Sequence, residues 1–141
     1  MPLKPRVLIV DDEEAFRSAL GKRLAVRGLE VNTVGSGKEA LEELRNKPYD
    51  VILLDVKMPG MSGIEALAEI KKINPLLEVI ILTGHASVDV AVEITKLGGY
   101  EYLIKPYPLE DLMEKVDAAF ERKVAREERV RKDKQLTDQK P

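Results

Sequence analysis

Apolar and polar residues alternate along the chain with two different periods. Five short apolar runs are rich in β-branched residues, which are typical of strands. Between these runs, apolar residues recur every three or four positions, which is typical of helices with one buried face. The five runs are RVLIV, LEVNTV, VILLD, EVIILTG and YEYLIK, at residues 6–10, 29–34, 51–55, 78–84 and 100–105.

The stretches between the runs also carry helix start and stop signals. The first places Phe16, Leu20 and Leu24 four residues apart and ends near Gly28. Strand–helix alternation repeated five times predicts a five-stranded parallel sheet with helices on both faces. The third and fourth runs are almost entirely apolar, so we expect them to be central strands. The second helix begins near Ser36, the third stops before Pro75, the fourth carries Val88, Val92 and Ile94 and stops at Gly98, and the fifth starts near Pro108.

The apolar period fades after Phe120, which divides the chain into two parts. We expect residues 1–120 to form one globular domain and residues 121–141 to form a charged tail. Glu127 and Arg131 occupy positions where the apolar period should recur. The tail is therefore expected to extend the last helix for a few turns, with its charges in solvent, and then to fray.

The composition is that of an ordinary globular domain and excludes several kinds of chemistry. The 141 residues are 44% hydrophobic and 34% charged with a net charge of −2, so we expect no direct binding to nucleic acid. The chain has no cysteine, which excludes disulfides, and its single histidine, His85, excludes a histidine-rich metal site. No apolar run reaches the ~18 residues of a membrane span. The expected location is the cytoplasm, without attachment to a membrane.

Polar residues stand at the carboxyl ends of four predicted strands. In a parallel sheet these ends meet at one edge, where ligands bind. The first strand is followed by Asp11 and Asp12, and the others end at Asp55, Thr83 and Lys105. Clustered carboxylates repel one another, and Mg²⁺ relieves this repulsion through oxygen ligands. Together with an ammonium and a hydroxyl, these acids form an apparatus suited to phosphoryl transfer, in which a carboxylate can be the nucleophile.

Four segments, in this order, resemble the receiver domain of two-component response regulators. They are VLIVDDEEAFR, DVILLDVKMPGMSGIEAL, VIILTGHAS and YLIKPY, within residues 4–120. The resemblance implies an α/β, flavodoxin-like, doubly wound parallel sheet with strand order 2-1-3-4-5. It implies a signalling switch that takes a phosphoryl group from a sensor histidine kinase or phosphotransfer protein and controls an output protein or domain. Such a domain is regulatory rather than an enzyme, although it catalyses its own phosphorylation and dephosphorylation.

By matching position, the resemblance implies a role for each residue at the strand ends. Asp55 resembles the phosphoacceptor of the family. Asp11 and Asp12 resemble the acid pair that holds Mg²⁺, with Asp55 and the main-chain carbonyl of Lys57 as further ligands. Lys105 resembles the lysine that contacts the phosphoryl group. The only cofactor implied is Mg²⁺.

The resemblance also implies a route from this site to the surface. Thr83 resembles the switch hydroxyl, which turns toward the phosphoryl group, and Tyr102 resembles the switch aromatic, which fills the space left behind. The responding surface would comprise the fourth helix, the fifth strand and the fifth helix, and could join two copies of the chain in a homodimer. Lys57 and His85 match positions that border the phosphoryl site and can tune its hydrolysis.

Simpler structural interpretations exist for all of these residues. The candidate roles are a helix cap for Asp11 and Asp12, a buried ion pair for Asp55 and Lys105, and an ordinary strand position for Thr83 and Tyr102. The segment GSGKEA, residues 35–40, fits a dinucleotide-binding turn, but it follows the second strand instead of the first. A helix start with small residues is enough to explain that segment.

Two other functions remain open from the sequence alone. A hydrolase of the haloacid dehalogenase type also uses a nucleophilic aspartate on a similar sheet. That family has a second acid two residues after the nucleophile, where this chain has Lys57. A pseudo-receiver would bind partners without being phosphorylated, and the complete set of site residues argues against it.

Overall fold

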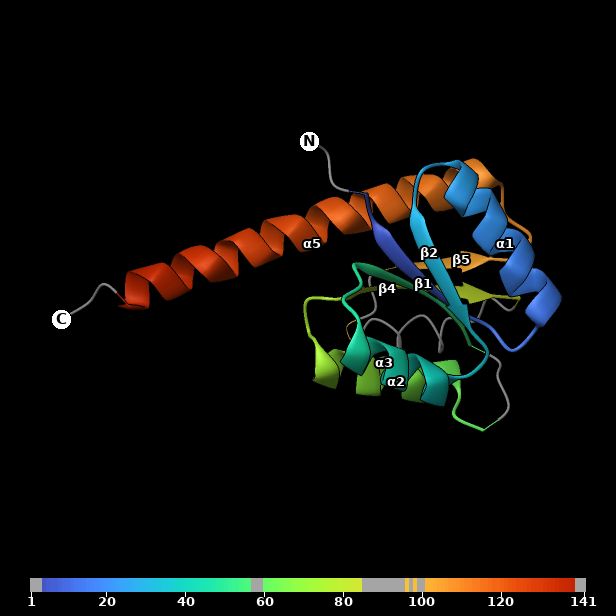
Figure 1. Cartoon of the computed structure of the whole chain (residues 1–141), viewed down its shortest axis with the longest axis horizontal. Helices are drawn as coiled ribbons and strands as arrows, with labels where there is room; N and C mark the ends of the chain where they lie inside the picture. Colours follow the sequence, from blue (N-terminus) through green and yellow to red (C-terminus); the bar gives the residue numbers. More distant parts are fainter. Residues whose placement is uncertain (1–3, 57–59, 85–95, 97, 99–100, 139–141) are drawn as a thin grey trace.

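Strands and helices alternate along the chain as the apolar pattern predicts (Figure 1). The computed structural model describes residues 4–56, 60–84, 96, 98 and 101–138. The fourth predicted helix, with Val88, Val92 and Ile94, lies outside the described residues. The elements are β1 (Arg6–Val10), α1 (Glu14–Val26), β2 (Glu30–Val34), α2 (Gly37–Asn46), β3 (Val51–Asp55), α3 (Gly63–Ile73), β4 (Glu78–Thr83), β5 (Glu101–Ile104) and α5 (Leu109–Asp138).

The sheet has five parallel strands in the order β2-β1-β3-β4-β5, which confirms the predicted topology. β3 and β4 are buried along their whole length, as their apolar sequences predict for central strands. The register pairs Val10 with Leu54 and Asp55 with Leu82. The carboxyl ends of β1, β3 and β4 therefore lie side by side at one edge of the sheet.

Of the helices that the structure describes, two cover each face of the sheet. Successive side chains of a strand point to opposite faces, so each strand contributes to two apolar cores. On one face Leu8 packs with Leu67 from α3, and on the other Ile9 packs with Leu24 from α1. Figure 1 shows α2 and α3 together on one side, with α1 and the first part of α5 on the other. The result is a doubly wound, three-layer fold.

The two described helices on the first of these faces, α2 and α3, both begin at a serine cap. The hydroxyl of Ser36 accepts a hydrogen bond from the Glu39 backbone N–H at 3.1 Å, and that of Ser62 accepts from Glu65 at 3.2 Å. The Glu39 carboxylate in turn accepts from the Gly35 backbone N–H at 2.7 Å, in the manner of a capping box. The GSGKEA segment is thus a capped helix start, as the sequence predicts.

α5 includes most of the charged tail. It runs without interruption from Leu109 to Asp138 and carries the tail away from the sheet (Figure 1). The expected helical extension of the tail is thus present, and it runs for about five turns beyond Phe120. The expectation that its charges lie in solvent is wrong for Lys123, which is only 3% exposed and donates to Asp50. This buried ion pair supplies a tertiary contact where the apolar period has ended. Despite the length of α5, no helix in the described part of the chain is apolar enough to cross a membrane.

Candidate functional site

The carboxyl edge of the sheet gathers the polar residues that the sequence singled out. β1 ends directly before Asp11 and Asp12, and β3 ends at Asp55 itself. Thr83 is the last residue of β4, and Lys105 directly follows β5. Since the strands are parallel and in register, the fold places all five side chains along one edge.

Asp11, Asp12 and Asp55 form an acid cluster at this edge. One carboxylate oxygen of each residue lies within 4.8 Å of those of the other two. Asp11 and Asp55 are buried, whereas Asp12 is exposed. Buried carboxylates at such separations repel one another, because water cannot screen their charges fully. The oxygen-only donor set suits a hard divalent cation such as Mg²⁺.

Asp11 divides its two carboxylate oxygens between the following turn and Lys105. Its Oδ1 accepts a hydrogen bond from the Glu13 backbone N–H at 2.9 Å, and its main-chain carbonyl accepts from the Arg17 side chain at 3.1 Å. Its Oδ2 lies 3.5 Å from Lys105 Nζ. The N-cap of α1 is Glu13, whose side chain makes no capping hydrogen bond. Asp11 therefore shapes the turn before α1, and helix capping does not account for Asp12.

Lys105 is held between an acid and an aromatic ring. Its Nζ lies 4.1 Å from the centroid of the Phe16 ring, a cation–π contact, and 3.5 Å from Asp11 Oδ2. Phe16 lies on α1, so this helix helps to orient the lysine. The ammonium is thereby placed next to the acid cluster, where it can meet a second anionic group.

Gly63 fixes the backbone on which Asp55 stands, a role that the sequence analysis missed. A Cβ at Gly63 would lie 2.3 Å from the Asp55 carbonyl oxygen and 2.6 Å from Val56 Cα. The Gly63 backbone N–H donates to the Val56 carbonyl at 3.0 Å. The start of α3 therefore rests directly on the end of β3. The only hint in the sequence is a glycine in the first turn of a helix that Ser62 already caps well.

An apolar hollow of about 470 Å³ adjoins the acid cluster between α1 and the segment that joins β5 to α5. Lys105 stands at its border, and Tyr107 forms part of its wall. Burial raises the pKa of Tyr107 to about 12, and the negative charge of Asp11 adds to this effect. The phenol therefore stays neutral at physiological pH. Further lining residues are Phe16, Ala19, Leu20, Arg23, Pro106 and Leu109.

Thr83 and Tyr102 lie on neighbouring strands with their side chains on the same face. The register pairs Tyr102 with Ile81, which is two residues before Thr83 and so shares its face. Thr83 is buried, whereas Tyr102 is 37% exposed. Lys57 and His85, which were expected to border the site, lie outside the described residues.

The chain is similar to known proteins over most of its length. The family model of the response regulator receiver domain matches residues 7–117. The DNA-binding transcriptional regulator NtrC of Klebsiella pneumoniae is 41% identical over 112 residues, which cover 79% of this chain and 24% of that protein. The chain thus spans about a quarter of the length of the curated relatives it matches.

Two solved structures are similar both in sequence and in fold. A response regulator receiver domain protein from Clostridium thermocellum is 40% identical with a TM-score of 0.81, covering 86% of this chain and 98% of that one. The beryllofluoride-activated NtrC4 receiver domain, solved as a dimer in solution, is 40% identical with a TM-score of 0.79. That match covers 84% of this chain and 98% of the NtrC4 chain.

Proposed function

The chain belongs to the response regulator receiver domain family, and on that premise we propose that phosphorylation of Asp55 by a histidine kinase switches its surface. Receiver domains of two-component regulators act as phosphorylation-dependent switches. The observation that carries the proposal for this chain is the meeting of the acid cluster with Lys105 at the carboxyl edge. A nucleophile, a cation site and a fixed positive charge are the parts that phosphoryl transfer needs.

The acid cluster fits Mg²⁺ through its donor chemistry. The proposed protein ligands are Asp11, Asp12, Asp55 and the main-chain carbonyl of Lys57. When bound, Mg²⁺ supplies positive charge that offsets the charges of the carboxylates and of the phosphoryl oxygens. Two of the three carboxylates are buried, so they are already desolvated before a ligand arrives.

The residues of the chain perform the transfer as follows. A carboxylate oxygen of Asp55 attacks the phosphorus of a phosphohistidine, and the new O–P bond forms as the P–N bond breaks. The electron pair of the broken bond returns to the imidazole nitrogen. The Lys105 ammonium neutralises part of the charge on the phosphoryl oxygens. In the return step, water attacks the phosphorus, inorganic phosphate leaves and the Asp55 carboxylate is restored.

The proposed switch consists of Thr83 and Tyr102. The Thr83 hydroxyl turns toward the new phosphoryl oxygens and leaves space behind it on the same face of the sheet. The half-exposed Tyr102 ring rotates inward to fill that space. The phosphoryl group thus biases one two-state element, and the surface formed by the fourth helix, β5 and α5 changes with it.

The proposed partners act at two different surfaces. A histidine kinase or phosphotransfer protein must bring its phosphohistidine to Asp55, and the apolar hollow beside Lys105 offers a docking surface at the same edge. The output partner or domain would respond to the surface containing β5 and α5. Since the NtrC4 receiver domain forms a dimer when activated, a homodimer through this second surface is part of the proposal. The cytoplasmic location stays a prediction.

The test is phosphorylation by a small-molecule donor. Incubation with acetyl phosphate and Mg²⁺ should add one phosphoryl group, about 80 Da, in an intact mass measurement. Asp55→Asn keeps the shape of the side chain, removes the nucleophile and should abolish the adduct. Asp117→Asn, which changes an exposed acid on α5, is the matched control and should retain it.

Each alternative function predicts a different result in the same experiment. A stoichiometric Mg²⁺-dependent adduct on Asp55→Asn would refute the assignment of the phosphoacceptor. A wild-type chain that never gains the adduct would be a pseudo-receiver. Rapid turnover of many phosphate esters would indicate a hydrolase of the haloacid dehalogenase type, against which Lys57 at the general-acid position argues.

A further inference from the structure

Two acids are buried at the amino edge of the sheet, opposite the candidate phosphorylation site. Asp50 directly precedes β3 and is 3% exposed, and Glu78 is the first residue of β4 and is 1% exposed. The same strands end at Asp55 and Thr83 at the other edge. Buried carboxylates need compensating positive charge, which the cations that pair with Asp50 and Glu78 supply.

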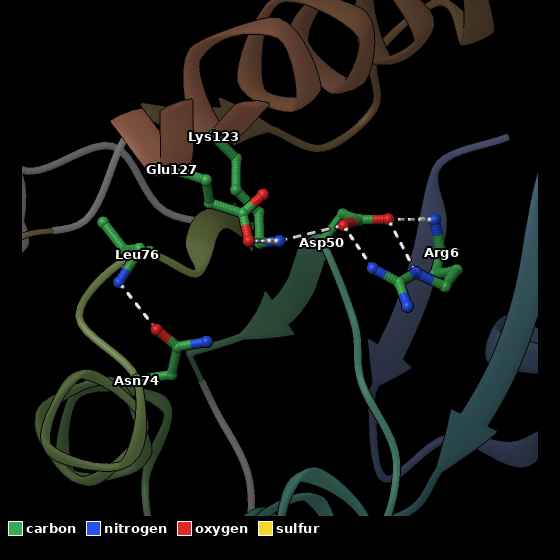
Figure 2. Close-up of polar contacts among 6 residues, drawn as sticks. All are labelled: Arg6, Asp50, Asn74, Leu76, Lys123 and Glu127. Atoms are coloured by element: carbon green, nitrogen blue, oxygen red, sulfur yellow. Dashed lines mark hydrogen bonds and ion pairs between the residues drawn. The ribbon is translucent and has the colours of Figure 1, made fainter. Parts of the chain in front are cut away.

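Asp50 is compensated by one cation from the sheet and one from the tail. It accepts three hydrogen bonds from Arg6, from the backbone N–H at 2.8 Å, Nε at 3.0 Å and Nη2 at 2.9 Å (Figure 2). Lys123 Nζ donates to Asp50 Oδ1 at 3.0 Å and also pairs with Glu127 at 3.1 Å. Figure 2 shows Lys123 reaching down from α5 to the strand end that Arg6 approaches from β1. Lys123, a residue of the tail, is therefore buried against the domain.

Glu78 is compensated by two arginines from the same part of α5. Its Oε1 accepts from Arg126 Nη1 at 2.9 Å and lies 3.2 Å from Arg122 Nε. Its Oε2 is buried and accepts no hydrogen bond from the described residues, so Glu78 depends strongly on these guanidinium groups. Arg126 also donates to the Pro75 carbonyl at 3.3 Å, just before β4.

Apolar contacts contribute little to this part of α5. The helical extension, residues 121–138, has exposed apolar side chains at Val124, Val130 and Leu136, with 42%, 52% and 61% of their surface in solvent. These three positions also lie on different faces of the helix, so they form no single stripe. The described polar contacts that tie the extension to the domain are therefore its ion pairs with Asp50 and Glu78 and the hydrogen bond from Arg126 to the Pro75 carbonyl. They end at Arg126, about a turn and a half beyond the last core residues of α5.

We propose that Lys123 and Arg126 are positioning residues that set the direction in which the helical extension leaves the domain. They hold its first turns on Asp50 and Glu78, at the starts of adjacent strands, and so keep the helix from bending or fraying beyond its last core residues. The charges fix how the helix docks, because Lys123 pairs with one acid of the domain, Asp50, and Arg126 pairs with one, Glu78. The proposal concerns the shape of the chain with or without phosphorylation and does not rest on the proposed function.

The test measures the distance between the extension and the domain. The chain has no cysteine, so cysteines introduced at Lys38 on α2 and Lys132 on the extension take two nitroxide labels selectively. Pulsed electron spin resonance on the otherwise unchanged chain should give one narrow distance distribution. In K123M/R126M the distribution should broaden about twofold or more, because a short helix without tertiary contacts frays or pivots. R129M/K134M changes two exposed cations on the same helix and should keep the narrow distribution.

Two further measurements separate positioning from general folding. A label pair at Lys22 and Lys38, within the domain, should remain narrow in K123M/R126M. R126K retains a cation opposite Glu78 and should keep the narrow distribution, whereas R126M should broaden it. An unchanged Lys38–Lys132 distribution in K123M/R126M would overturn the proposal. If that variant loses its fold, identical distributions for R126M and R126K would overturn it instead.

Discussion

The two edges of the sheet both bury acids, but they balance the charge of those acids differently. At the carboxyl edge, three carboxylates lie together and Lys105 contacts one of them, Asp11. At the amino edge, each buried acid meets two cations. The pairs are Asp50 with Arg6 and Lys123, and Glu78 with Arg122 and Arg126.

This difference separates function from stability along the same strands. β3 has Asp50 just before its first residue and Asp55 at its end. At the amino edge, each buried acid is paired with cations of the chain itself, so these charges contribute to holding the structure together. Among the described residues of the carboxyl edge, three carboxylates lie together beside Lys105, an arrangement that a cation and a phosphoryl group can engage. Replacing an acid at the amino edge should therefore lower the free energy of unfolding, whereas replacing one at the carboxyl edge should mainly change Mg²⁺ binding.

The largest expected effect is the loss of stability in Asp50→Asn. The change leaves the buried Lys123 ammonium without its full counter-charge, which typically costs about 3–5 kcal/mol in free energy of unfolding. Asp12→Asn in the metal-free protein should change that free energy by less than about 0.5 kcal/mol, because Asp12 is exposed. Urea unfolding of both variants measures the contrast. Equal, small effects would show that the amino edge is not an essential ion-pair site.

The next largest effect is the stabilisation by Mg²⁺, which should depend on the carboxyl edge. At 100 times its dissociation constant, Mg²⁺ should raise the free energy of unfolding of the wild type by about 2.7 kcal/mol. Asp12→Asn should lose most of this gain, whereas Asp117→Asn should keep it. Urea unfolding with and without Mg²⁺ provides the measurement. A gain as large in Asp12→Asn as in the wild type would remove Asp12 from the proposed ligand set.

Gly63→Ala tests how tightly the backbone of the carboxyl edge is fixed. A Cβ placed 2.3 Å from the Asp55 carbonyl oxygen forces the backbone to move, at a cost of about 2 kcal/mol. Because Asp55 moves with it, Mg²⁺ affinity should fall as well, which calorimetric titration can detect. Gly84→Ala is the control, since a Cβ there meets nothing within 4 Å among the described residues. If both variants bind Mg²⁺ like the wild type, the contact does not position Asp55.

A smaller effect is the acid dependence of stability contributed by Asp50. Burial acts to raise the pKa of Asp50, but hydrogen bonds from Arg6 and Lys123 outweigh it and hold that pKa below its ordinary value of 3.8. A carboxyl group with a lowered pKa stabilises the fold above its unfolded pKa and loses this contribution as the pH falls through the folded pKa. Unfolding by urea between about pH 5 and pH 3 should therefore show a shallower decline in Asp50→Asn than in the wild type. Parallel declines would contradict the assigned shift.

The smallest expected effect on stability accompanies Thr83→Ala. Loss of one buried hydroxyl should cost about 1 kcal/mol, and the variant should still be phosphorylated. NMR shift changes across residues 87–120 on adding beryllofluoride with Mg²⁺ should shrink markedly relative to the wild type. A full response in the variant would show that the signal leaves the carboxyl edge by another route.

The strands themselves and the carboxyl edge could be predicted from the sequence because both follow from local patterns. The apolar run before Asp55 predicts a buried strand that ends at this acid. In a parallel sheet, such carboxyl ends lie together at one edge. The resemblance to receiver domains supplied the order of the strands, which apolar periodicity alone does not determine. The structure confirms that order and places the three acids together.

The amino edge could not be predicted in the same way. The pair of Lys123 with Asp50 joins residues 73 positions apart, and charged residues outside an apolar helix stripe are usually in solvent. Yet a signal was present, because Glu78 and Asp50 are acids set against buried apolar runs, just as Asp55 is. Burying such an acid costs free energy unless a positive charge lies beside it, and for Asp50 and Glu78 much of that charge comes from the tail. Gly63 shows the opposite case, in which only the folded backbone reveals the contact.

Because α5 is uninterrupted to Asp138, the length of the extension decides which way the end of the helix faces. Each residue of an α-helix advances the chain by about 1.5 Å and turns it by about 100°. Removing one residue after Arg126 would therefore swing anything joined to the end of the helix around to another side, with almost no change in its distance. Removing seven would restore its orientation to within about 20°. One end of the helix is fixed on the domain, so each residue removed from the extension rotates a module fused to its other end by about 100°. A series of single-residue deletions would therefore change the orientation of that module in steps.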